Sequence, residues 1–178
     1  MKHTQILFAS LAIGLGNIES AQTADDEFIE AIETLRSVGS EGRGNAAASK
    51  ALKRLSNGGK ELIPALLTAM DGANSFSLNY LRGAVEVISS KTLSKGESLP
   101  LVELGEFLLN KSHDTKPRAM AFDLIRRADA NAAERLIPGM LSDPSVDLRR
   151  EAVARLVGQA GDLVKKNNKP AAILIYRQ

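Results

Sequence analysis

The sequence contains no cysteine and no tryptophan, and aromatic residues make up only 4% of its 178 residues. The absence of cysteine excludes disulfides, a thiol nucleophile, cysteine-ligated zinc and a lipid-modified cysteine after an export signal. Because aromatic residues are so few, a core must be filled by leucine, isoleucine, valine and alanine, which is more typical of packed helices than of sheets. The composition therefore favours a helical protein.

Histidine is almost as scarce, with only His3 and His113 in the chain. A histidine-rich metal site or a Cys–His pair is therefore excluded. His113 lies in the polar stretch 111–117, where we expect a solvated turn residue and not a catalytic base. The glycine-rich stretch 39–45 lacks the Lys-Ser/Thr of a phosphate-binding loop. The sequence thus predicts no enzyme active site, no metal site and no cofactor.

The N-terminus has the pattern of a secretory signal peptide. Lys2 supplies a positive charge, residues 6–16 form a short apolar run, and small and polar residues follow. The run is shorter than the roughly 20 residues that a helix needs to cross a bilayer. We predict a signal peptide over residues 1–23, export to a periplasm or to the outside, and no stable membrane anchor after cleavage. A buried first helix is the alternative.

From Asp25 onward, apolar residues recur every three or four positions, as in FIEAIETL over residues 28–35. This spacing places them on one face of a helix, and no alternating run indicates a strand. The chain is therefore predicted to be all-α, with a lead-in helix and turn over residues 24–44.

Two sequence markers recur with a similar period, which predicts a repeat architecture. The first, a polar residue three positions before a small or branched one, begins at Asn45, Arg82, Arg118 and Arg149, with spacings of 37, 36 and 31 residues. The second, a proline beside an apolar run, occurs at Pro64, Pro100 and Pro138, with spacings of 36 and 38 residues.

Each repeat is predicted to be a pair of antiparallel helices. The second helix of a pair begins near its proline, whose missing N–H is tolerated in a first turn. One pair cannot cover its own apolar face, so neighbouring pairs must stack. The expected fold is an α-solenoid of about four pairs over residues 45–160. The pairs are expected at 45–70, 76–110, 116–141 and from 145 onward.

The strongest motif is SDPSVDLRREAVARL, residues 142–156. It resembles the HEAT-repeat family, whose first helix carries the signature D-P-x-x-x-V-R-x-x-A-x-x-x-L. The matching positions are Asp143, Pro144, Leu148, Arg149, Ala152 and Leu156, with Leu148 where valine is usual. Arg118 with Ala121, and Arg82, repeat part of the signature, whereas the unit at Asn45 lacks the arginine. The likeness covers residues 45 to about 158.

The resemblance implies a structural role for these residues, because in the family the aspartate and arginine help neighbouring turns to bond in a ladder. Asp143 is also expected to cap the helix that Pro144 begins. Arg149 is expected to make a structural bond. Arg150 has no counterpart in the other units, so it is less constrained to a structural role.

In HEAT-like arrays the second helices line the concave side. The candidate partner-binding residues on that side are Glu61, Glu103, Glu106, Glu134 and Arg135. Because a mostly acidic groove repels phosphate, no nucleic acid is expected as a partner.

Residues 161–178 are expected to begin a further helical unit. Few residues follow its apolar face, which includes Ile173, Leu174 and Tyr176, to cover it. The unit is either truncated or docked back on the preceding pair.

The leading hypothesis is a non-catalytic, exported helical-repeat scaffold that binds a protein partner or a neighbouring domain of the same polypeptide. The second is the N-terminal scaffold of a larger exported enzyme, acting on polysaccharide, whose catalytic domain lies beyond Gln178. A HEAT-like nucleic-acid-binding protein comes third.

Overall fold

The structure is a computed structural model, and it describes residues 26–178. Every regular element in this range is helical and none is a strand, so the prediction of an all-α fold is confirmed. The expected signal peptide, residues 1–23, lies outside the described residues.

The first helix covers 26–36. The elements that follow are α2 (Asn45–Leu55), the 3-10 helix η1 (Lys60–Leu62), α3 (Ile63–Ala69), α4 (Ser75–Ser94), α5 (Leu101–Leu109), α6 (Thr115–Ala128), α7 (Ala130–Leu136), the 3-10 helix η2 (Ile137–Met140), α8 (Val146–Lys165) and α9 (Lys169–Tyr176).

Short polar side chains begin several of these helices. The Asn74 side chain accepts the N–H groups of Phe76 and Ser77 at the start of α4. Asp129, Ser145 and Asn168 cap α7, α8 and α9 in the same way. Each cap satisfies N–H groups that have no partner inside the helix. The polar turns in the sequence therefore set where these helices begin.

Two predictions about helix starts are wrong. Asp143 does not cap α8, because the helix begins two residues beyond Pro144 and Ser145 is its N-cap. Pro138 does not begin a second helix, because α7 has already started at Ala130 and Pro138 lies in η2. Since proline has no N–H to donate along an α-helix, the chain tightens into a 3-10 turn there. Pro64 and Pro100 do lie at the start of α3 and immediately before α5.

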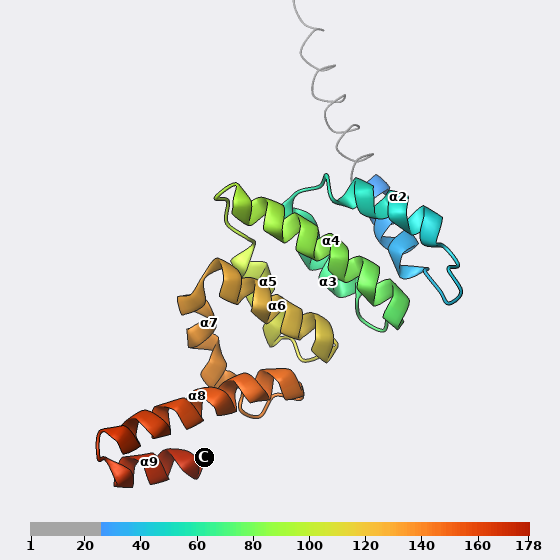
Figure 1. The fold of residues 1–178 in the computed structure, drawn as a ribbon. Coiled ribbons are helices and arrows are strands. Elements are labelled where there is room, and N and C mark those ends of the chain that lie inside the picture. The colour runs from blue at the N-terminus through green and yellow to red at the C-terminus, as the bar shows by residue number, and fades with distance from the viewer. Residues whose placement is uncertain (1–25) are drawn as a thin grey trace, which may run out of the picture.

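The helices follow one another in chain order, with α2 and α9 at opposite ends of the molecule (Figure 1). α3 packs on α4, α5 on α6, and α8 on α9, while α2 also packs on α4 and α3 on α6. The predicted pairing of helices within 45–70 and within 76–110 is therefore wrong, because α2 does not pack closely on α3, nor α4 on α5. α3 and α5 each pack on the helix that follows, across the predicted pair boundaries.

One apolar cluster runs through most of the described chain, from Ala31 to Ala152. Its fully buried members are mainly leucine and alanine, as the shortage of aromatic residues predicts. The cluster thins at the C-terminal end, where the 20-residue helix α8 buries only Leu148, Ala152 and Ala160. The last two helices are thus covered on fewer sides than the others.

Candidate functional site

Polar bonds join four short segments at the turns between helices (residues 36–38, 71–77, 113–118 and 143–149). We call this set of segments the turn ladder. Its first rung joins the first two turns. Arg36 Nη2 donates to the Asp71 carbonyl at 2.9 Å, and Asn74 Nδ2 donates to the Val38 carbonyl at 2.9 Å. The buried Ser77 hydroxyl donates to the Arg36 carbonyl at 2.7 Å. These partners are 35 to 41 residues apart in sequence, close to the spacing of the sequence markers.

The second rung is reciprocal. Asp71 Oδ1 accepts the Asp114 N–H at 2.8 Å, and Asp114 Oδ2 accepts the Gly72 N–H at 2.7 Å. His113 Nδ1 lies 2.6 Å from Asp71 Oδ2, and its ring stacks on Phe107 with centroids 3.9 Å apart. His113 is therefore not the solvated turn residue that the sequence predicts, because the neighbouring turn and Phe107 hold it partly buried.

The third rung is a buried ion pair between α6 and the turn before α8. Arg118 Nη2 donates to Asp143 Oδ2 at 2.6 Å and Nη1 to Oδ1 at 3.0 Å, while Nε donates to the Leu108 carbonyl at 2.8 Å. Arg118 is 1% exposed and Asp143 3% exposed. Asp143 Oδ1 also accepts the Ser145 N–H at 2.8 Å. The pair is thus bidentate and fully hydrogen-bonded, the geometry in which a buried ion pair is tolerated.

The surroundings keep Asp143 ionised. Burial raises the pKa of a carboxyl, but the hydrogen bonds from Arg118 and the Ser145 N–H oppose it. The positive charges of Arg118 and Lys111 act in the same direction. Together they hold the pKa of Asp143 below its ordinary value.

The three arginines at the predicted repeat position have different environments. Arg118 is buried on Asp143, and Arg149 Nη1 donates to the Asp143 backbone carbonyl. Arg82 is exposed on α4. The repeat position therefore serves the turn ladder at Arg118 and Arg149 and is available for another role at Arg82.

The alanine and leucine positions of the signature pack in the interior or at its edge. Ala121 and Ala152 are buried, and Leu156 is half-buried. Ala152 and Leu156 share the lining of a small cavity with Ile137 and Leu141 of the preceding unit. At this cavity they face the segment that precedes α8.

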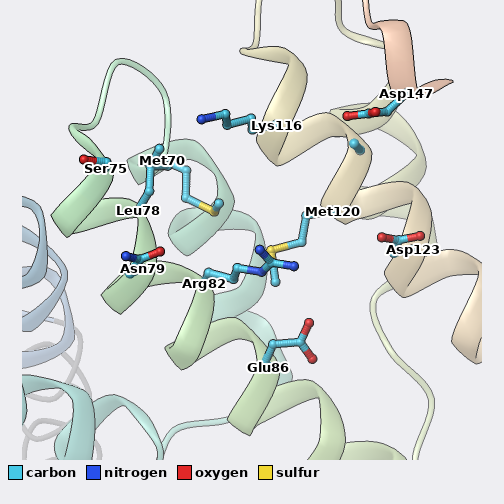
Figure 2. A pocket seen from close by; sticks show the side chains of 11 residues that line it. Met70, Ser75, Leu78, Asn79, Arg82, Glu86, Lys116, Met120, Asp123 and Asp147 are labelled. Carbon is cyan, nitrogen blue, oxygen red and sulfur yellow. The ribbon is translucent and has the colours of Figure 1, made fainter. Parts of the chain in front are cut away.

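A groove of about 400 Å³ lies between α4 and α6 and reaches the start of α8 (Figure 2). Its apolar lining consists of Met70, Leu78, Ala119 and Met120. Its charged lining consists of Arg82 and Glu86 from α4, Lys116 and Asp123 from α6, and Asp147 from α8. Residues from three helices thus combine an apolar floor with charges of both signs.

Two of the groove's carboxylates are paired with arginines outside its lining. Glu86 accepts from Arg127 at 2.9 Å, and Asp123 pairs with Arg126 one turn along α6. Arg82, Lys116 and Asp147 form no ion pair and no side-chain hydrogen bond with another of the described residues. Two cations and one carboxylate are therefore available to a ligand in the groove.

None of the predicted partner-binding residues lines the groove. Glu61 lies in η1, Glu103 and Glu106 are exposed on α5, and Glu134 and Arg135 are on α7. The last two are engaged within the chain. Arg155 Nε lies 3.3 Å from Glu134, and Arg135 Nη2 lies 3.9 Å from Asp129.

Helical spacing carries a partial signal for the groove. Leu78, Arg82 and Glu86 are four residues apart on α4, and Lys116, Met120 and Asp123 recur at four and three on α6. Each set therefore shares one helix face. The sequence does not show that the two faces meet, because this depends on how α3, α4 and α6 pack.

Residues 26–178 contain no helix long and apolar enough to span a membrane, and no group of three or more histidine, aspartate or glutamate residues arranged to hold a metal ion.

Comparisons with protein-family models, curated proteins and solved structures found no match. The likeness to HEAT repeats stays a prediction from the residues.

The buried ion pair gives a first prediction. Arg118→Ala leaves Asp143 buried without its partner and should lower the free energy of unfolding by about 3–5 kcal/mol. The measurement is urea denaturation followed by circular dichroism. Lys50→Ala, an exposed change on α2, is the matched control and should stay within about 0.5 kcal/mol of the parent chain. Equal losses in the two variants would contradict a structural role for Arg118.

The lowered pKa of Asp143 gives a second prediction, on acid stability. Its ionised form contributes stability that is fully present above the unfolded-state pKa of about 4 and is lost as the pH falls through the lower folded-state value. The parent chain should therefore exceed Asp143→Asn in free energy of unfolding by the same margin at pH 7 and pH 5. The margin should shrink below about pH 4. A margin already lost at pH 5 would show that the carboxylate is not stabilised by its neighbours.

Proposed function

We propose that the protein is a non-catalytic, exported helical-repeat scaffold that binds a partner protein, and that the groove between α4 and α6 receives a segment of that partner. The observation that carries the proposal is the presence of two unpaired cations, Arg82 and Lys116, beside an apolar floor containing Met70 and Met120. The segment belongs to another protein or to a neighbouring domain of the same polypeptide.

The scaffold itself is proposed to be a HEAT-like α-solenoid. The common period of the two sequence markers supports this architecture, as does the turn ladder, whose first two rungs join residues 35 to 43 positions apart. The pairing of Arg118 with Asp143 of the following unit resembles the aspartate–arginine ladder of the family. Such an array supplies long grooves between stacked helices, which suit extended partners.

The groove favours a peptide segment in which an acidic residue lies beside an apolar one. A guanidinium can bind a carboxylate through two parallel hydrogen bonds, and Lys116 adds a second positive charge. The flexible thioethers of Met70 and Met120 adapt to apolar side chains of different shape. Asp147, at the α8 end, suits a basic or amide group farther along the segment. The three carboxylates in the lining disfavour a nucleic-acid backbone.

A peptide selection tests the groove. A display library of random peptides, selected against the full chain, should be enriched in sequences that pair Asp or Glu with Met, Leu or Phe. Affinity for such a peptide, measured by fluorescence anisotropy, should fall about tenfold or more in Arg82→Glu, because the charge that meets the carboxylate is reversed. It should also weaken with added salt.

The control is Arg43→Glu, which makes the same reversal in the exposed turn before α2 and should leave the affinity unchanged. Enrichment of basic peptides, or equal losses in the two variants, would contradict the proposal.

A deletion tests the array. Removing residues 116–141 takes away α6, which packs on α3 and α5, and η2, which packs on α8. The remaining helices should lose their sharp, cooperative unfolding transition, because each unit covers the apolar face of the next. Thermal unfolding followed by circular dichroism measures this. A remainder that unfolds as cooperatively as the parent chain would contradict the stacking.

A further inference from the structure

α8 carries a stripe of exposed valines along one side. Val146, Val153, Val157 and Val164 are 69%, 47%, 50% and 42% exposed, and they are separated by seven, four and seven residues. Seven and eleven residues are close to two and three full helical turns, so the four side chains lie nearly in line over the length of the helix. We call this set the valine stripe. The described part of the chain leaves it uncovered.

The valine stripe is symmetric about Arg155. Val153 and Val157 lie two residues from it on either side, and Val146 and Val164 lie nine residues away on either side. When two copies of α8 lie antiparallel with Arg155 at the same level, Val146 faces Val164 of the other copy and Val153 faces Val157. A self-complementary surface of this kind is what a two-fold dimer requires.

The positions beside the stripe allow two helices to approach closely. Ala154, Gly158 and Gly161 lie along one flank, and a Cβ added at either glycine would meet nothing within 4 Å. Packing inside the described chain therefore does not require glycine there, although glycine inside a helix costs about 1 kcal/mol relative to alanine. A second helix against this flank supplies a reason for the small residues.

Charges on the same flank are complementary in the antiparallel arrangement. By helical rotation, Asp147 and Lys165 lie on the flank that also carries Gly161. The two-fold axis brings Asp147 of one copy close to Lys165 of the other, at both ends of the pair. A parallel arrangement would instead place the two Asp147 side chains together, and likewise the two Lys165 side chains, which is unfavourable.

We propose that the valine stripe is the interface for a second copy of this chain. The two α8 helices pack antiparallel about a two-fold axis at the level of Arg155 along the helix, and the Arg155 side chain itself points away from the interface, toward Glu134. The proposal does not rest on the peptide-binding function, because none of the four valines lines the groove; Asp147 alone belongs to both surfaces.

Sedimentation equilibrium of the full chain tests the association. A reversible monomer–dimer equilibrium is expected, and Val157→Glu should raise its dissociation constant about tenfold or more, because the substitution buries a charge at the centre of the interface. Val102→Glu, the same substitution at a 72% exposed valine on α5, is the matched control and should leave the equilibrium unchanged. Circular dichroism verifies that both variants are folded. A monomer at all concentrations, or equal effects of the two variants, overturns the proposal.

Cysteine cross-linking tests the orientation, and the chain has no cysteine of its own to interfere. An oxidised mixture of Val146→Cys and Val164→Cys chains should give a covalent dimer, whereas each variant alone should not. Like positions at the ends of antiparallel helices lie about 27 Å apart, at 1.5 Å per residue. Cross-linking of Val146→Cys alone indicates parallel helices and overturns the proposal. Absence of cross-linking in the mixture also overturns it, and the stripe then serves a further unit of the chain or another protein.

Discussion

The buried ion pair between Arg118 and Asp143 fixes the position of α8, and the far end of the groove depends on it. One guanidinium joins three segments, because it bonds the carbonyl of Leu108 at the end of α5 as well as the carboxylate that precedes α8. Asp143 in turn holds the N–H of Ser145, the residue that caps α8. Asp147 follows two residues later and lines the groove. The Arg118–Asp143 ion pair, which is not part of the groove lining, thus positions the charged end of the groove.

The rungs of the turn ladder differ in strength because they differ in burial. Asp71 and His113 keep 28% and 20% of their side chains exposed, so water screens their pairing, and the bond serves mainly to align two turns. Arg118 and Asp143 are shielded from water, so loss of either partner leaves an uncompensated charge in the interior. Bonds of the same turn ladder can therefore contribute very different free energies to the stability of the fold.

The sequence contains enough information to predict the helices but not their contacts. Apolar spacing predicts the all-α fold, which the structure confirms, and the recurrence of arginine at positions 118 and 149 predicts a repeat position. The sequence does not decide the cap of α8, because aspartate and serine are both good caps. Arg118, 25 positions earlier, binds the carboxylate of Asp143, and Ser145 is therefore the residue that caps the helix. The groove was missed for the same kind of reason. Arg82 and Lys116 lie on separate helices, and only packing of α4 against its neighbours brings them to one cavity.

The charges of the groove are explained by the ion pairs that cross between helices. Arg127 of α6 pairs with Glu86 of α4, and Arg126 of α6 pairs with Glu151 of α8 at 3.1 Å. Each pair spans two helices, but because all four side chains are more than a third exposed, it holds their spacing only weakly. Because Arg127 already neutralises Glu86, Arg82 on the same face of α4 has lost the carboxylate one turn away that would otherwise pair with it. Arg82 is thus left available to a ligand in the groove.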